Sequence, residues 1–327
     1  MQAKAMQAGQ RLGYGCAVLI LAQLGVSGAV QASCGSAFCG VNTQWDAQGL
    51  WDKPGLRADL RFEYIDQDQP RSGSDKVAVG ALPRHHDEVQ TINRNWLLNL
   101  DYGFDNNWGV TLTLPYMDRS HDHIHNHHGN QIPEAWDFTE AGDVRVLGRY
   151  KFDQQPFQSG AAGVKFGLKL PTGDYEVAND DGDLAERTLQ PGTGTTDLIL
   201  GAYYQRPVVG SSLYWFAQTL WQQPLNDRAD YRAGYQLAID GGLQYGLTEH
   251  LAGLLQLNIQ IKGRDSGTEA EREDSGSQTL SLSPGLSYAL TKTARVYGFV
   301  QVPLYHYVNG IQLTADQAYM VGATMAF

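Results

Sequence analysis

The sequence predicts an all-β fold, a closed antiparallel transmembrane β-barrel of about 12 strands with long extracellular loops and short periplasmic turns. Three observations lead to this prediction. The chain opens with a secretory signal and has no later apolar run suited to a spanning helix. Apolar and polar residues alternate strictly in segment after segment, and long and short connections alternate between those segments.

The N-terminal end is typical of an exported protein. Residues 1–11 carry basic side chains and no acid, residues 12–30 are almost wholly apolar or small, and "VQA" ends at Ala32. This three-part pattern predicts a cleaved signal peptide at residues 1–32. A membrane-anchoring helix is the alternative, and the Gly, Gln and Ser residues that interrupt the apolar run argue against it.

Two cysteines remain after the predicted cleavage, Cys34 and Cys39. A close pair of cysteines in an exported protein favours a disulfide that closes a small loop. We expect this disulfide in a periplasmic N-terminal segment at residues 33–55, which is also a candidate docking site for a periplasmic partner. The net charge of −11 and the absence of a basic patch argue against nucleic acid as a partner.

The first predicted strand, "LRADLRFEY", shows the alternation most clearly. One face carries Leu56, Ala58, Leu60, Phe62 and Tyr64, and the other carries Arg57, Asp59, Arg61 and Glu63. In a barrel the apolar face contacts outer-membrane lipid and the charged face lines the lumen. The same pattern runs to the last segment, "QAYMVGATMAF", whose terminal aromatic residue resembles the assembly signal of bacterial outer-membrane barrels. The barrel is therefore predicted to span residues 56–327.

The connections between these segments provide an independent indication. The long ones are expected outside the cell, at residues 66–88, 118–141, 171–196 and 263–276. The short ones are expected in the periplasm, at residues 105–107, 207–210, 247–248 and 292–293. This rhythm predicts that both ends of the chain lie on the periplasmic side of the outer membrane.

Two motifs resemble a known family. "KLPTGD", Lys169 to Asp174, and "LQPGTGTTDLILG", Leu189 to Gly201, look like the two ends of a central outer loop in the transporter-like outer-membrane barrels of the phenol meta-degradation pathway family. The resemblance implies a porin-like outer-membrane barrel with a solute channel. The prolines and glycines of both motifs also favour turns, so shaping the loop is an alternative role for them.

The inward face of the predicted barrel is rich in charge. Its candidate lumen-lining residues are Arg57, Asp59, Arg61, Glu63, Asp101, Asp143, Arg145, Arg149, Lys151, Lys165 and Lys169. A cationic wall favours anions, so we expect a channel or transporter for small solutes that are anionic or aromatic. The alternative is a salt-bridged interior that is plugged by residues 33–55, and the sequence leaves both interpretations open.

A histidine run, "HDHIHNHH", lies in the second predicted outer loop. If this segment is extended, alternate histidines share one side and could bind Zn²⁺, Cu²⁺ or Ni²⁺. The candidate ligands are His85, His86, His121, His123, His125, His127 and His128. A polar loop that packs over the barrel mouth is the alternative, and no other cofactor is expected.

The sequence gives no indication of an enzyme. It lacks the GxSxG pattern of serine hydrolases, and neither His250 nor His306 has a serine at a recognisable spacing. His306 falls in phase with the lipid-facing residues of its predicted strand. A channel is therefore the expected function, with a metal-binding outer-membrane protein or a partner-docking barrel subunit as alternatives.

Overall fold

The computed structural model describes residues 40, 41, 43, 54–81, 86–127, 130–152 and 160–327. The predicted signal peptide at residues 1–32 and the predicted Cys34–Cys39 disulfide lie outside the described residues. So do His85, His128 and the side chain of His127. These assignments therefore stay predictions.

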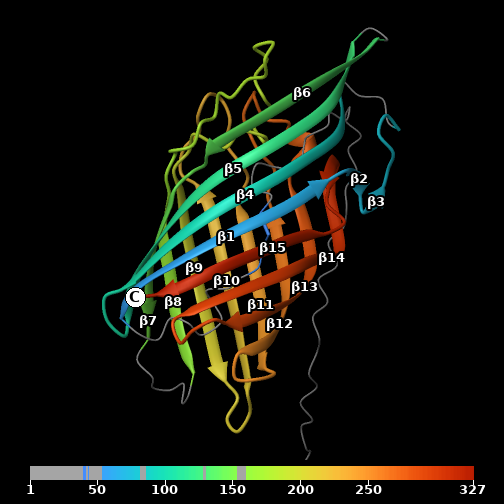
Figure 1. Cartoon of the computed structure of the whole chain (residues 1–327). Coiled ribbons are helices and arrows are strands. Elements are labelled where there is room, and N and C mark those ends of the chain that lie inside the picture. The colour runs from blue at the N-terminus through green and yellow to red at the C-terminus, as the bar shows by residue number, and fades with distance from the viewer. Residues whose placement is uncertain (1–39, 42, 44–53, 82–85, 128–129, 153–159) are drawn as a thin grey trace, which may run out of the picture.

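In the described part of the chain, twelve strands form one closed antiparallel barrel (Figure 1). They are β1 (Gly55–Gln67), β4 (His86–Gly103), β5 (Trp108–His127), β7 (Arg145–Lys151), β8 (Ala161–Lys169), β9 (Asp197–Pro207), β10 (Leu213–Pro224), β11 (Gln236–Gly246), β12 (Leu251–Lys262), β13 (Ser277–Ala289), β14 (Ala294–Thr314) and β15 (Ala318–Ala326). Each pairs with two neighbours, and the β1–β15 ladder joins the first strand of the ring to the last. The predicted fold is confirmed.

Three further strands lie outside the ring. β2 (Gln69–Gly73) pairs with the outer end of β14 and with β3 (Asp75–Lys76), while β6 (Asn130–Ala141) pairs with the outer half of β5. β5 and β6 together form a long hairpin that projects beyond the ring (Figure 1). The prediction of a loop over residues 118–141 was therefore wrong, because this segment continues as paired strands. The described helical structure is one 3₁₀ turn, η1 (Arg272–Asp274), so no described helix is long and apolar enough to cross a membrane.

The two faces of the wall have opposite chemistry. Outward side chains are apolar and exposed, as Leu60 shows with 46% exposure, whereas the inward Glu63 is fully buried. Polar residues fill the inner face on the opposite side of the barrel too, and Asn258 donates a hydrogen bond to Asp240 at 2.9 Å. This arrangement is the reverse of a soluble core. The wall therefore has an apolar outer face and a polar inner face, as transmembrane barrels have.

A β-bulge changes which way the outer part of β14 faces. The register between β13 and β14 shifts between Leu280 and Ser281, so one extra residue, Leu304, is accommodated in β14. Past the bulge His306 turns inward and lines a second cavity of the lumen. The prediction that His306 faces lipid was wrong, since a bulge reverses the alternation on which that prediction depended.

Residues of the N-terminal segment lie inside the barrel. Val41 packs in an apolar cluster with Ile65, Tyr297 and Met320, and its N–H donates to the carboxylate of Glu63 at 3.1 Å. The positions of Gly40, Val41 and Thr43 therefore agree with the alternative prediction, in which the N-terminal segment enters the lumen. The docking of a periplasmic partner through residues 33–55 remains a prediction.

A buried ion cluster anchors the long outer loop 170–196, which we call the lid. Lys169 Nζ donates to Asp143 at 2.7 Å and lies 3.3 Å from Asp197. Asp143 in turn accepts hydrogen bonds at 3.0 Å from the N–H groups of Gly173 and Thr193, one near each end of the lid.

The motif glycines allow this close approach. A Cβ at Gly192 would come within 2.5 Å of the carbonyl oxygen of Gly173, so only glycine fits where the two ends of the lid cross. The two motifs therefore shape one structure, the crossing point above Asp143. This finding agrees with the loop-shaping role that their composition suggested.

We expect Lys169→Met to destabilise the folded barrel by about 3–5 kcal/mol, because it removes the ammonium group that forms ion pairs with two buried carboxylates. Urea unfolding of the purified protein in micelles measures the change. Lys165→Met, on the same strand but facing the open cavity, is the matched control and should have a smaller effect. Equal stability of the wild type and the Lys169 variant would contradict the anchoring role.

Candidate functional site

The main cavity of the lumen lies against the inner faces of β1, β4, β5, β7–β10 and β15. Its volume is about 190 Å³, which is space for on the order of ten water molecules. Apolar side chains, among them Leu147, Tyr203 and Phe216, share the lining with charged groups. The cavity therefore offers both ionic and aromatic contacts to a small molecule.

Seven of the predicted lumen-lining residues form part of this lining: Arg57, Asp59, Arg61, Asp101, Arg145, Arg149 and Lys165. Five are cations and two are acids, so the formal charge of the lining is +3 (five minus two). The lining of this cavity is therefore positively charged, although the chain as a whole is negatively charged. Such a wall attracts anions.

The other predicted lumen residues have different surroundings. Glu63 is fully buried and forms an ion pair with Arg61 at 3.0 Å. Lys169 and Asp143 belong to the lid anchor rather than to the open cavity. Lys151 lies at the end of β7 and is half-buried, outside the cavity lining.

The lid crosses the mouth of the barrel. It begins at β8 and returns at β9, yet Leu189 packs in one apolar cluster with Trp136 on β6 and Leu313 on β14, the latter on the far side of the ring. The carbonyl oxygen of Leu189 also accepts a hydrogen bond from the buried side chain of Arg119 on β5. Because the lid is connected to β8 and β9 and also contacts β14 on the far side of the ring, it lies over the outer entrance to the lumen.

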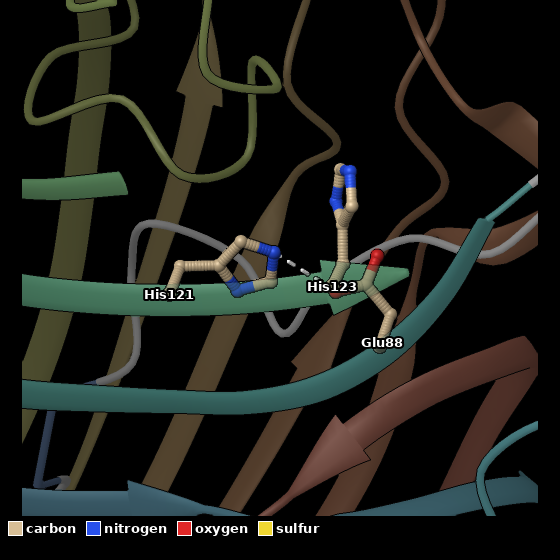
Figure 2. Close-up of side chains that lie close together, drawn as sticks. All are labelled: Glu88, His121 and His123. Atoms are coloured by element: carbon tan, nitrogen blue, oxygen red, sulfur yellow. Dashed lines mark ion pairs between the residues drawn. The ribbon is translucent and has the colours of Figure 1, made fainter. Parts of the chain in front are cut away.

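The histidine run contributes two buried side chains to the outer rim of the barrel. His121 and His123 lie on the inner side of β5, with exposed fractions of 1% and 5%, next to Glu88 of β4 at 2%. Figure 2 shows the carboxylate of Glu88 pointing toward the imidazole of His121, and the Oε2 to Nε2 distance is 3.3 Å. The prediction that alternate histidines share one side is confirmed for this pair.

Hydrogen bonds fix the orientation of both imidazoles. Nδ1 of His121 is 2.9 Å from the hydroxyl of Thr91, and Nε2 of His123 is 2.8 Å from the carboxylate of Glu134 on β6. Glu134 also contacts Nδ1 of His125 at 3.3 Å. Burial lowers the pKa of His121 to about 3 and also lowers the pKa of His123, so both rings are neutral at neutral pH.

His86 links the same rim to two loops. Its ring stacks on that of His123 with centroids 5.2 Å apart. Its Nε2 is 3.0 Å from Glu186 of the lid and 2.9 Å from Glu271 of the outer loop between β12 and β13. Burial alone would disfavour the charged ring, but the hydrogen bonds and charges of the two glutamates outweigh burial and raise the pKa of His86 to about 11. His86 is therefore a cation that holds both loops to β4.

Sequence reasoning missed the acidic partners of the histidines. Glu88, Glu134, Glu186 and Glu271 come from four separate segments, and no local spacing connects them to the run. The available signal was the inward phase of β5, which placed His121 and His123 together but did not indicate what faced them.

Comparisons with known proteins agree with this architecture. Residues 68–309 match the family described as "Putative MetA-pathway of phenol degradation". The fold is similar to that of an outer membrane channel from Pseudomonas putida F1, with 12% identity, coverage of 87% of this chain and 99% of that chain, and a TM-score of 0.63. The NanC porin, at 11% identity, is covered over 100% of its chain and 83% of this one, with a TM-score of 0.45.

At these identities the similarity concerns the fold alone. No curated protein sequence matches this chain. The family match covers more than half of the chain and includes both motifs that predicted it. The chain therefore belongs to this phenol-degradation-associated family and is a β-barrel of the bacterial outer membrane.

Proposed function

We propose that the protein is a channel through which small anionic solutes, including aromatic carboxylates, cross the outer membrane. The observation that carries this proposal is the main cavity, whose lining has a formal charge of +3 in a chain of net charge −11. The fold similarity to a protein named an outer membrane channel supports the same function.

The aromatic part of the proposal rests on the mixed lining. Lys165 lies 5.9 Å from the centre of the Tyr203 ring, and Arg145 and Arg149 line the same cavity. A cation beside an aromatic face suits a ligand with a carboxylate and an apolar ring, because each part meets a complementary group. A simple inorganic anion would use the cations alone.

We expect single channels in a planar bilayer to be anion-selective, with a reversal potential in a KCl gradient that indicates chloride over potassium. The selectivity should decrease as the salt concentration rises, because salt screens the wall charges. Arg57→Gln combined with Arg145→Gln should shift the reversal potential toward zero. Arg206→Gln, on the exposed outward side of β9, is the matched control and should leave it unchanged. Cation selectivity, or a double variant identical to wild type, would contradict the proposal.

The position of the lid predicts that it limits the current. Deleting residues 178–186 removes the tip of the lid and Glu186 but keeps the anchor at Asp143. We expect this variant to have a larger single-channel conductance than the wild type, since the outer entrance is less obstructed. Heat-dependent migration on a denaturing gel controls for folding of the barrel. An unchanged conductance of the folded variant would show that the lid does not restrict the path.

A further inference from the structure

We propose that Glu88, His121 and His123 form a binding site for a divalent transition-metal ion, with Zn²⁺ as the reference ion, at the outer rim of the barrel. This inference does not depend on the channel function. It also narrows the seven histidines that the sequence suggested to two, and it adds a carboxylate from another strand.

The first argument is the convergence of the three side chains. One ligand atom from each residue lies within 4.8 Å of the others. Glu88 is paired with His123 across the β4–β5 ladder, and His121 is two residues away on the same face of β5. A register shift between Glu88 and Gln90 lets both Glu88 and Thr91 face inward, although their odd spacing would place them on opposite sides of a regular strand.

The second argument is the set of groups that hold the imidazoles. In protein metal sites a ligating histidine normally uses its second nitrogen to bond a carboxylate or another polar group, and that bond fixes the ring. Glu134 binds Nε2 of His123, and among the described residues its buried Nδ1 has no hydrogen-bond partner. Thr91 binds Nδ1 of His121, while Nε2 of that ring faces Glu88. Each ring therefore has one nitrogen that a neighbouring side chain holds and a second nitrogen that is the candidate ligand atom.

The third argument concerns the ion that suits this set. Two neutral imidazoles and one carboxylate are ligands of Zn²⁺ and similar transition metals, whereas Ca²⁺ and Mg²⁺ prefer oxygen ligands alone. Three protein ligands leave one position of a tetrahedral zinc open. The ring of His86 stacks on that of His123, and its Nε2 lies 3.0 Å from Glu186 of the lid, so the site lies where the lid meets the wall.

The test uses the full-length protein purified in detergent and stripped of metal with EDTA. Isothermal titration with Zn²⁺ should show one tight site per chain, and Ca²⁺ and Mg²⁺ should not compete. Glu88→Gln and His123→Asn should each weaken binding at least about tenfold, because each removes one of three ligands. His127→Asn combined with His128→Asn is the matched control from the same histidine run and should leave the affinity unchanged.

X-ray absorption of the zinc-loaded wild type provides a readout that does not depend on any variant folding. Two imidazole ligands and oxygen in the remaining positions are expected. The proposal is overturned if the wild type binds no stoichiometric Zn²⁺, if the zinc has fewer than two imidazole ligands, or if the Glu88 and His123 variants bind like wild type. Loss of binding in the His127 and His128 control would overturn it as well, because the zinc would then depend on histidines outside the proposed set.

Discussion

The structure depends on one constraint: no backbone hydrogen bond can be left unmade in hydrocarbon. The β1–β15 ladder meets this constraint by joining the first strand to the last, so that the sheet has no free edge within the membrane. Once the ring is closed, its outer face must match lipid and its inner face must match water. The exposed Leu60 and the fully buried Glu63, three residues apart on one strand, result from that division.

Beyond the membrane the same strands serve a different purpose. About 9–11 residues are enough for a strand to span a bilayer, yet β4 has 18 and β5 has 20. The additional residues form a wall above the membrane. The lid contacts that wall at Leu189, while Asp143 anchors both ends of the lid. Charge in this region is arranged in two ways. Cations outnumber acids in the lining of the main cavity, whereas the neutral imidazoles of His121 and His123 lie beside carboxylates at the rim, so an anion and a metal ion would bind at different parts of one entrance.

Alternation along a strand made most of the fold predictable, since each outward residue of "LRADLRFEY" is apolar and each inward one is charged. The shared side of His121 and His123 followed from the same rule.

The rule fails at bulges, and one bulge brings Glu88 to the histidines while another turns His306 into the lumen. It also cannot relate distant segments: Glu186 and Glu271 reach His86 across 100 and 185 residues of chain (186 minus 86, 271 minus 86), and only the folded lid and loop bring them there. The extended hairpin of β5 and β6 was missed because polar alternation outside a membrane resembles a loop.

Spin labels at two adjacent positions test the central division of the wall most directly. Nitroxides attached at Leu60→Cys and at Asp59→Cys, in protein without Cys34 and Cys39, are compared in lipid vesicles for relaxation by oxygen, which concentrates in lipid, and by a water-soluble nickel chelate. The lipid-facing label at position 60 should respond to oxygen and be protected from nickel, while the label at position 59 should show the weaker oxygen response of a water-filled interior. Equal exposure of both positions to nickel, or the opposite assignment, would show that this strand does not separate hydrocarbon from an enclosed polar lumen.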